Sequence, residues 1–422
     1  MNGPRMIYRY VVVRLYRQAR SLRTRAVGSP RFAFRGVSCT FCTYKTYDTF
    51  RMTSAAAVTC PALQRGSRMR TSMITGVALL GAGALLLAGC SGDTAGTGTD
   101  SGDPASTPLS YSQPHTDPFQ NAENVGSMER FAELGYATIP ATNADRDAAQ
   151  QITDIQTLIN KGAKGLVISV GDADAIVPAI EYANDAGVPI VAIDEAPASG
   201  NIAMIVRADN VNMGALACEE MGSRVAAGSA VITLDGDPVT SNGRDRTNGF
   251  NDCMKENYPD VQLVNVATEW DPAKAATGIE TALNQYSNVA GIYNQSDATF
   301  FPTILDTLQS IGKLIPVGEA GHIVQVSVDA SPMAMTAIRD GWLDAAIAQP
   351  MTDYIDYGAD YLTRAIEGET FAPGETDHGS VIEERNGNLV DLLPTPVVTK
   401  ENVDDPQLWG NKQFALDAFG VA

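Results

Sequence analysis

Histidine is scarce in this chain of 422 residues, which contains only His115, His322 and His378. No Cys and His residues stand at the spacing of a zinc site, and both a G-x-S-x-G nucleophile motif and a glycine-rich phosphate loop opening a helix are missing. Asp194 and Glu195 are adjacent carboxylates, but neighbours at a strand end diverge instead of facing each other across a glycosidic bond. The sequence therefore predicts neither an enzyme nor a protein with a metal or other cofactor.

The N-terminal apolar stretch, Ile74–Ala88, has fifteen residues and is too short to span a bilayer as a stable helix. Arg68 and Arg70 precede it, and a cationic region followed by such a stretch predicts an export signal over residues 69–89. The stretch leads into Leu87-Ala88-Gly89-Cys90, which resembles the cleavage motif of bacterial lipoproteins. The alternative is an ordinary secretory signal followed by an incidental cysteine.

Cys90 is the predicted lipidation site. Each acyl CH₂ buried in lipid contributes roughly 0.8 kcal/mol, so several chains on one cysteine hold a domain at the membrane surface. Residues 90–107 are rich in Gly, Ser, Thr and Asp and are expected to form a flexible tether. These features predict an extracytoplasmic protein anchored to the bacterial membrane by an N-terminal lipid.

Acidic residues are missing from residues 1–68 apart from Asp48, while arginine is frequent. A nucleic-acid-binding arm could be argued from this composition. We prefer a simpler interpretation, in which translation starts at Met69 or residues 1–68 are removed with the signal. Either way, this segment is expected to lie outside the fold.

Basic residues are scarce after the signal. The whole chain has 30 Lys and Arg and 49 Asp and Glu, and residues 1–89 hold 14 of the basic residues and one of the acidic residues. The rest of the chain therefore has 16 basic and 48 acidic residues and a net charge of −32. A surface of this charge repels nucleic acid and anionic lipid. Nucleic acid is therefore excluded as a partner.

Cysteine is also scarce. Cys39, Cys42 and Cys60 fall in the leader and Cys90 is assigned to lipid, which leaves Cys218 and Cys253. In an oxidising compartment these two could form a disulfide, since both lie on expected helices of one domain. The alternative is two buried free thiols.

Apolar strands and amphipathic helices alternate from about residue 108 onward. This order predicts βαβ units with right-handed crossovers, hence doubly wound, Rossmann-like parallel sheets in an α/β fold of two lobes. The expected strands are 165–169, 189–194, 230–234, 261–266 and 291–294, and the expected helices are 148–161, 173–186, 211–227, 244–257, 272–285 and 298–312.

Polar side chains follow the expected strands at their carboxyl ends, where ligands bind in such sheets. Carboxylates and amides can bond to vicinal hydroxyls, and an aromatic face can cover the apolar side of a sugar ring. The residues are Ser169, Asp194, Glu195, Arg244, Arg246, Trp270, Gln295, Ser296, Asp297, Asp329 and Gln349.

At this point the chain resembles the type I periplasmic sugar-binding proteins of bacterial ABC importers, the ribose-binding-like family, over residues 108–405. Each matching motif is short, and it is their order along the chain that carries the resemblance. The motifs are Asp117-Pro118-Phe119, 133–136, 164–168, 186–194, Asp209-Asn210, 244–250, 295–297, 327–329 and 347–350.

The resemblance implies roles in a sugar pocket for particular residues of this chain. Asp194 would accept hydroxyl hydrogen bonds, Arg246 would donate to sugar oxygens, and Phe119 and Trp270 would sandwich the ring. Asp329 and Gln349 would close the pocket, from the second lobe and from a hinge strand. The further pocket positions are Asp117, Gln120, Ser169 and Ser296.

This chain departs from the ribose type at three of those positions. It has Asp117, Glu195 and Ser296 where the family has Asn, Arg and Asn, so the pocket is expected to be more acidic. A cationic amino sugar, or a polyol that presents more donors, is therefore favoured over ribose.

Several of these residues have a simpler structural interpretation. Asp194 and Asp117 could cap helices, Glu195 could point to solvent, and Trp270 could be core packing. Arg244 and Arg246 could be surface charges. His322 lies in a segment longer than in the ribose type, and is expected on a surface loop or, alternatively, at the pocket rim.

The resemblance also implies three crossings between the lobes, near residues 209–210, 349–351 and 392–396. Lobe 1 would comprise residues 108–208 and 350–392, and lobe 2 residues 209–349 and 393–422. A ligand bound between the lobes would favour the closed form through this three-segment hinge.

The expected function is a monomeric lipoprotein that captures a monosaccharide or polyol and delivers it to an ABC permease and its ATPase. A receptor component that senses a small molecule such as an autoinducer would use the same fold, so the sequence leaves it open. A sugar-responsive DNA-binding repressor would need a basic helix-turn-helix where this chain has its signal.

Overall fold

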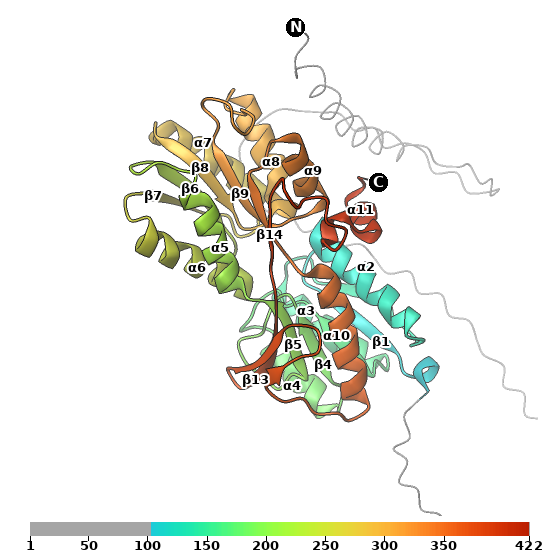
Figure 1. The fold of residues 1–422 in the computed structure, drawn as a ribbon. Coiled ribbons are helices and arrows are strands. Elements are labelled where there is room, and N and C mark those ends of the chain that lie inside the picture. Colours follow the sequence, from blue (N-terminus) through green and yellow to red (C-terminus); the bar gives the residue numbers. More distant parts are fainter. Residues whose placement is uncertain (1–102, 422) are drawn as a thin grey trace, which may run out of the picture. The chain divides into compact units, whose positions relative to one another are not determined.

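The computed structural model describes residues 103–421, and two β-sheets organise this part of the chain (Figure 1). We call each sheet with its helices a lobe. In lobe 1 the strand order is β11-β12-β13-β5-β4-β3-β1-β2. Its strands are β1 (Leu109–Gln113), β2 (Thr142–Asn143), β3 (Gly165–Ile168), β4 (Ile190–Ile193), β5 (Met204–Ala208), β11 (Gly374–Glu375), β12 (Val381–Arg385) and β13 (Asn388–Leu393). Its helices are α2 (Pro118–Glu133), α3 (Ala148–Asn160), α4 (Val177–Asp185) and α10 (Met351–Ile366).

Lobe 2 is built on the second sheet, in the order β14-β10-β9-β8-β6-β7. Its strands are β6 (Ala230–Asp235), β7 (Gln262–Ala267), β8 (Val289–Asn294), β9 (Val324–Asp329), β10 (Ala345–Ala348) and β14 (Val397–Val398). Its helices are α5 (Asn210–Gly222), α6 (Ser241–Asn257), α7 (Pro272–Gln285), α8 (Asp297–Ser310), α9 (Pro332–Asp340) and α11 (Gln413–Phe419), with a short 3₁₀ helix at Trp409–Asn411.

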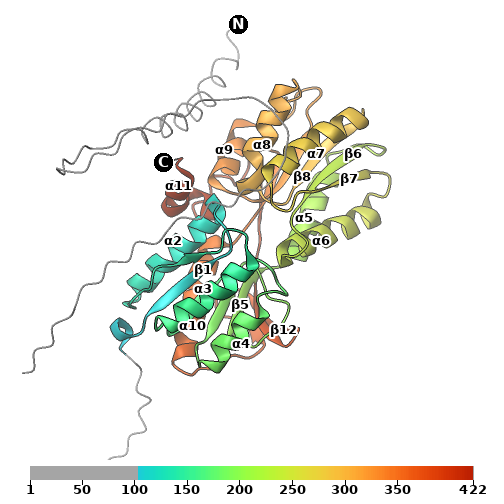
Figure 2. The same cartoon turned by 180° about the vertical axis from the view of Figure 1, so that it is seen from behind.

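Helices cover both faces of the lobe 1 sheet, and successive strand residues point to opposite sides, so its central strands are buried on both faces. In β3, Leu166 and Ile168 pack with residues of α3 and α4, whereas Val167 belongs to the core shared with α2 and α10. Accordingly, α10 stands in front of the sheet in Figure 1, and α3 and α4 stand in front of it in Figure 2. The α/β fold with two doubly wound lobes is confirmed.

Most strands of the two sheets are parallel, as expected, and each sheet carries antiparallel pairing at one edge. β11, β12 and β13 pair antiparallel with one another, and β14 runs antiparallel to β10. A short turn joins β12 to β13, with Asn386 and Gly387 at positive φ, and such a turn can only produce an antiparallel pair. The remaining strands are parallel.

The chain passes between the two sheets three times. β5 ends at Ala208 and leads into α5, β10 ends at Ala348 and leads into α10, and β13 ends at Leu393 shortly before β14. Lobe 2 also contacts lobe 1 directly, since α11 packs against α2 and the Trp409 ring meets the Phe119 ring edge-on with centroids 5.7 Å apart. Three covalent connections and these contacts therefore join the lobes.

Several predictions concern segments at the chain's start. The leader over residues 1–68, the signal peptide over residues 69–89 and lipidation at Cys90 lie outside the described residues. At the end of the predicted tether, residues 104–106 form a 3₁₀ helix whose Pro104 carbonyl accepts a hydrogen bond from the Ala137 amide. This part of the tether therefore belongs to the folded protein. No helix within residues 103–421 is both long and apolar enough to cross a membrane.

Helices α5 and α6 pack unusually closely, and a disulfide joins Cys218 to Cys253 across their contact. A Cβ on Gly249 would lie 1.9 Å from the Val211 carbonyl oxygen, so glycine is required there for the close approach. This packing fixes the position of α6 relative to the rest of lobe 2.

Removing the disulfide is expected to destabilise the protein without changing its fold. The bond closes a loop with a sequence separation of 35 residues, and loss of such a constraint on the unfolded chain costs about 2–4 kcal/mol. Urea unfolding of the Cys218→Ala/Cys253→Ala variant should show this loss, and the reductant-treated wild type should match it. Equal stability of the variant and the oxidised wild type would show that the bond is dispensable.

Candidate ligand-binding site

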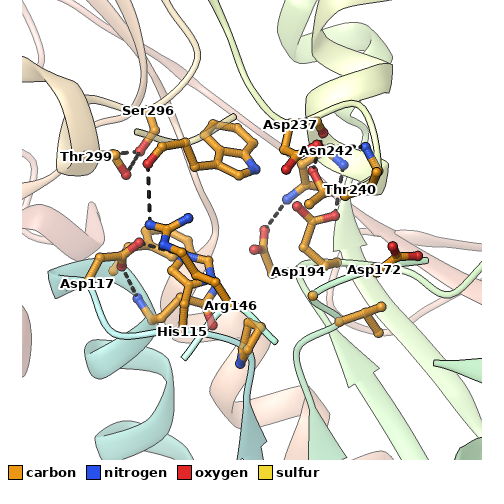
Figure 3. A pocket seen from close by; sticks show the side chains of 18 of the residues that line it. His115, Asp117, Arg146, Asp172, Asp194, Asp237, Thr240, Asn242, Ser296 and Thr299 are labelled. Atoms are coloured by element: carbon orange, nitrogen blue, oxygen red, sulfur yellow. Dashed lines mark hydrogen bonds and ion pairs between the residues drawn. The ribbon is translucent and has the colours of Figure 1, made fainter. Parts of the chain in front are cut away.

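A cavity of about 330 Å³ lies where the carboxyl ends of the strands of both sheets converge (Figure 3). Lobe 1 contributes residues that follow β1, β3 and β4, and lobe 2 contributes residues that follow or end β6, β7, β8 and β9. Ten of the eleven predicted site residues line it, namely Asp117, Phe119, Gln120, Asp194, Glu195, Arg246, Trp270, Ser296, Asp329 and Gln349. This is the position at which open α/β sheets bind ligands.

Asp194 lies at the end of β4 and is almost completely buried. Its Oδ1 accepts hydrogen bonds from Asn242 Nδ2 at 2.7 Å and from Gln349 Nε2 at 3.3 Å. Burial and the neighbouring Glu195 carboxylate raise the pKa of Asp194 to about 7, against the opposing effects of Arg246 and Asn242. A hydrogen-bond donor bound beside Asp194 would therefore favour its charged form.

Glu195 points across to lobe 2 and not to solvent, so the alternative of a solvent-exposed side chain is wrong. Its Oε2 accepts hydrogen bonds from Ser241 Oγ at 2.6 Å and from the Asn242 amide at 2.9 Å. Both donors belong to the first turn of α6, whose N-terminus favours a negative charge. Glu195 therefore holds the start of α6 against lobe 1.

Arg246 is buried at the lobe 2 side of the cavity. Its Nε donates to Asn210 Oδ1 and its Nη1 to the Gln295 carbonyl oxygen, both at 2.7 Å, and Nη1 lies 3.9 Å from Asp329 Oδ1. Its Nη2 is buried and has no hydrogen-bond partner among residues 103–421. A buried guanidinium N–H left in this way indicates a place for an acceptor atom of a ligand.

Asp329 and Ser296 form the wall beside Arg246. Ser296 Oγ donates to Asp329 Oδ2 at 2.6 Å and caps α8 through the Thr299 amide. Burial and the nearby Asp297 carboxylate raise the pKa of Asp329 well above its ordinary value, against the attraction of Arg246. Asp194 and Asp329, one from each lobe, are thus buried carboxyls of the cavity wall with a raised pKa.

Two aromatic side chains line the cavity, Phe119 from lobe 1 and Trp270 from lobe 2. Trp270 stacks on Phe300 behind it at 6.1 Å between centroids, so it both lines the cavity and packs in the core of lobe 2. Phe119 is held from behind by Trp409. Each ring is thus backed by a second ring, which restricts its orientation.

The residues after β1 have two roles. Asp117 caps α2 by accepting from the Gln120 amide at 2.8 Å, lies 3.0 Å from His115 Nε2 and also lines the cavity. Gln120 Nε2 donates to Ser169 Oγ at 3.3 Å, and its Oε1 has no partner within the described residues. Ser169 is not among the cavity-lining residues and acts behind it, as the support of Gln120.

Sequence reasoning missed several lining residues, including Arg146, Asp172, Asp237 and Asn242. Arg146 Nη2 donates to the Trp270 carbonyl oxygen at 3.3 Å, which ties lobe 1 to lobe 2. These residues lie in loops or a helix start, where no periodic pattern identifies them. Asn242 had one usable signal, since it precedes Arg246 by one helical turn.

Arg244 and His322 lie elsewhere. Arg244 donates to the carbonyl oxygens of Pro238 and Val239 and is not among the cavity-lining residues. His322 is held between the Ile315 carbonyl oxygen at 2.7 Å and Asp344 Oδ2 at 2.8 Å. The loop before it, residues 317–321, is exposed as expected, whereas the His322 side chain itself is turned inward and does not line the cavity.

The backbone is left-handed at several of the lining positions. Asp194 has φ +59°, Trp270 +55° and Asp329 +108°, and Arg146 and Glu269 are also positive. Such conformations cost of order 1–3 kcal/mol each for residues other than glycine and persist where the surroundings impose them. The strand ends therefore store strain at the site.

The comparisons with known proteins agree with this architecture. A model of the periplasmic binding protein domain family matches residues 111–370. The chain belongs to this family, and its resemblance to the type I periplasmic sugar-binding proteins is confirmed.

The individual proteins that match this chain have low sequence identity to it. The ribose import binding protein of Salmonella typhimurium is 26% identical over 60% of this chain and 82% of its own length. The xylitol-binding protein of Mycolicibacterium smegmatis is 24% identical over 67% of this chain and 74% of its own length. An ABC transporter solute binding protein from Mycobacterium smegmatis with bound glycerol has a TM-score of 0.61 at 22% identity, covering 70% of this chain and 95% of its own. This last likeness shows the fold.

The buried carboxyls predict that the ligand-free protein loses stability as the pH rises from about 5 to about 7.5. An aspartate in the unfolded chain has a pKa near 4, whereas that of Asp194 in the folded protein is about 7. Between these values the folded state binds more protons, so the stabilisation is complete below the lower pKa and is lost as the pH passes the higher one. Calorimetric melting temperatures should fall across this range.

Asp194→Asn removes one of the titrating groups, so it should raise the melting temperature at the alkaline end and reduce the slope. Asp260 is exposed, and Asp260→Asn serves as the control for loss of a surface charge. A wild-type melting temperature that rises with pH over this range, or an equal effect of both substitutions, would contradict the assignment.

Proposed function

We propose that this protein captures a monosaccharide or a related polyol between its lobes and delivers it to an ABC import permease and its ATPase. The observation that carries the proposal is the convergence of carboxylates, a buried arginine and two backed aromatic rings from both lobes on one cavity. Carboxylates accept from ligand hydroxyls, Arg246 donates to a ligand oxygen, and Phe119 and Trp270 cover apolar C–H surfaces. Relatives named for ribose, apiose and xylitol support the same class of ligand.

The ligand contacts both lobes and therefore favours the closed form of the protein. Asp194, Phe119 and Gln120 belong to lobe 1, and Arg246, Trp270 and Asp329 to lobe 2. Because a ligand between them gains both sets of contacts when the lobes are together, its binding shifts the population toward closure. The closed, liganded protein is the form that we expect the permease to recognise.

We further propose that the protein is a monomer held at the outer face of the cell membrane by lipid on Cys90. The support comes from the sequence, in which an export signal and a lipoprotein-like motif precede the binding domain. A tether after Cys90 would keep the binding domain within reach of the permease. Labelling with a fatty acid analogue should depend on Cys90 and be lost in Cys90→Ser.

The ligand class follows from the charge of the cavity. Eight carboxyl side chains line it against two arginines, namely Asp117, Asp147, Asp172, Asp194, Glu195, Asp237, Glu269 and Asp329 against Arg146 and Arg246. We therefore favour a donor-rich polyol or a cationic amino sugar over ribose. Calorimetry should show D-glucosamine or xylitol binding more tightly than D-ribose. Binding of ribose together with no binding of any amino sugar or polyol would contradict this choice.

A thermal-shift screen of the protein from Ser91 onward against pentoses, hexoses, polyols and amino sugars tests the function as a whole. A ligand at 100 times its Kd stabilises the folded state by about 2.7 kcal/mol, which is visible as a higher melting temperature. Failure of every such compound to raise the melting temperature would contradict the proposed capture of a monosaccharide or polyol.

The Asp194→Asn variant should bind the identified ligand about 10- to 100-fold more weakly, because a hydrogen bond to a charged acceptor contributes roughly 1.5–3 kcal/mol. Calorimetric titration measures this change, with the exposed Asp260→Asn as the control that should bind like the wild type. Equal affinity of Asp194→Asn and wild type would show that Asp194 does not hold the ligand.

A further inference from the structure

A row of hydrogen bonds leads from Asp194 in the cavity to the first interlobe crossing. Gln349 Nε2 donates to Asp194 Oδ1 at 3.3 Å, and Gln349 Oε1 accepts from the Tyr354 hydroxyl at 2.7 Å. The same hydroxyl accepts from the Ala208 amide at 3.0 Å. Ala208 is the last residue of β5, and Gln349 lies at the second crossing, so Tyr354 joins two of the three crossing segments.

A second row reaches the same residue from the other side of the cavity. Arg246 Nε donates to Asn210 Oδ1 at 2.7 Å, and Asn210 Nδ2 donates to the Ala208 carbonyl oxygen at 3.1 Å. The two rows therefore end on the N–H and on the C=O of Ala208. These groups lie on either side of its Cα, so the bonds together restrain both φ and ψ of the residue where the chain leaves lobe 1.

The intermediate residues lie behind the cavity. Tyr354, Asn210 and Ala208 are each at most 1% exposed and are not among the residues that line it. Asp194, Gln349 and Arg246 do line it. A change at the cavity wall can therefore reach Ala208 through these bonds without any ligand contact to Tyr354 or Asn210.

The direction of each bond is fixed by chemistry. The Ala208 N–H can only donate, so the Tyr354 hydroxyl accepts a hydrogen bond from it and donates one to Gln349 Oε1. This orients the Gln349 amide with its NH₂ group toward Asp194. Because Asp194 is an acceptor, its occupation by a ligand or its loss of charge alters the bond from Gln349 and hence the whole row.

We propose that Tyr354 and Asn210 are positioning residues. They couple changes at Asp194 and Arg246 in the cavity wall, such as ligand binding or loss of charge, to the backbone conformation of the hinge at Ala208. The coupling itself is a property of the protein and can be measured without a ligand. Its use in sugar capture rests on the function proposed above.

The test is a cycle of variants in the ligand-free protein, read as hydrogen exchange of the Ala208 amide. Tyr354→Phe removes the acceptor of that amide and should speed its exchange about 2- to 10-fold, as expected for one net hydrogen bond. Asp194→Asn should speed exchange at Ala208 in the wild type but add nothing in the Tyr354→Phe background. Equal effects of Asp194→Asn in both backgrounds, or none in either, would overturn the proposal.

Tyr361 provides a matched control on the same helix. Its hydroxyl is also bonded, to Asp391 Oδ2 at 3.0 Å in lobe 1, and it does not line the cavity. In the Tyr361→Phe background, Asp194→Asn should keep its full effect on Ala208. If Tyr354→Phe fails to fold, Asn210→Asp tests the second row, because it keeps an oxygen for Arg246 but loses the donor to the Ala208 carbonyl.

Ligand binding gives a readout that a purely structural tyrosine would not change. For whichever of D-ribose, xylitol, D-glucosamine and myo-inositol binds the wild type, Tyr354→Phe should weaken binding about tenfold, and Tyr361→Phe should not. Equal weakening by both would indicate a general loss of packing and overturn the coupling. If none of the four binds, the same comparison is made with a ligand from the wider thermal-shift screen. If no compound of that screen binds, the proposed function fails, while the exchange cycle still decides the coupling.

Discussion

Two buried carboxyls, Asp194 of lobe 1 and Asp329 of lobe 2, constrain the rest of this structure. Burial raises the pKa of both, and Arg246 is the cation that opposes this shift at each. A charge taken out of water is costly unless it is paired and hydrogen-bonded. Hydrogen-bond donors that a ligand brings into the cavity between them would therefore stabilise their charged forms.

The backbone around these carboxyls reflects the same constraint. Asp194 and Asp329 both have positive φ, in a conformation that residues other than glycine adopt only when the surroundings hold them. Asn242 of lobe 2 and Gln349 at the second crossing hold Asp194, while Ser296 of lobe 2 holds Asp329. Strain and desolvation are thus concentrated at the strand ends, and helix packing and the Cys218–Cys253 disulfide stabilise the scaffold that carries them.

Much of this site could be predicted from the sequence, because parallel strands bring their carboxyl ends to one edge whatever the intervening loops do. By that rule the sequence alone places Asp194, Arg246, Trp270, Asp329 and Gln349 close together. Beyond the last residue of a strand, the direction of a side chain depends on the local backbone and its neighbours, which the apolar pattern of the strand does not encode. For this reason Ser169 was expected in the cavity and lies behind it.

Contacts between the lobes were the least predictable part. Glu195 bonds to the start of α6, and Arg146 reaches the Trp270 carbonyl, across sequence separations that no local signal bridges. The antiparallel strands β11 to β13 were also missed, because β12 is mostly exposed and lacks a continuous apolar run. Local pattern thus predicts the lobes, and tertiary contacts decide how they meet.

Small-angle X-ray scattering with and without a bound sugar or polyol tests the central claim, that a ligand held between the lobes favours the closed form. The radius of gyration of the wild type should decrease on ligand addition and remain unchanged in a variant that does not bind. Tight binding of a ligand in the cavity without any compaction would contradict the account.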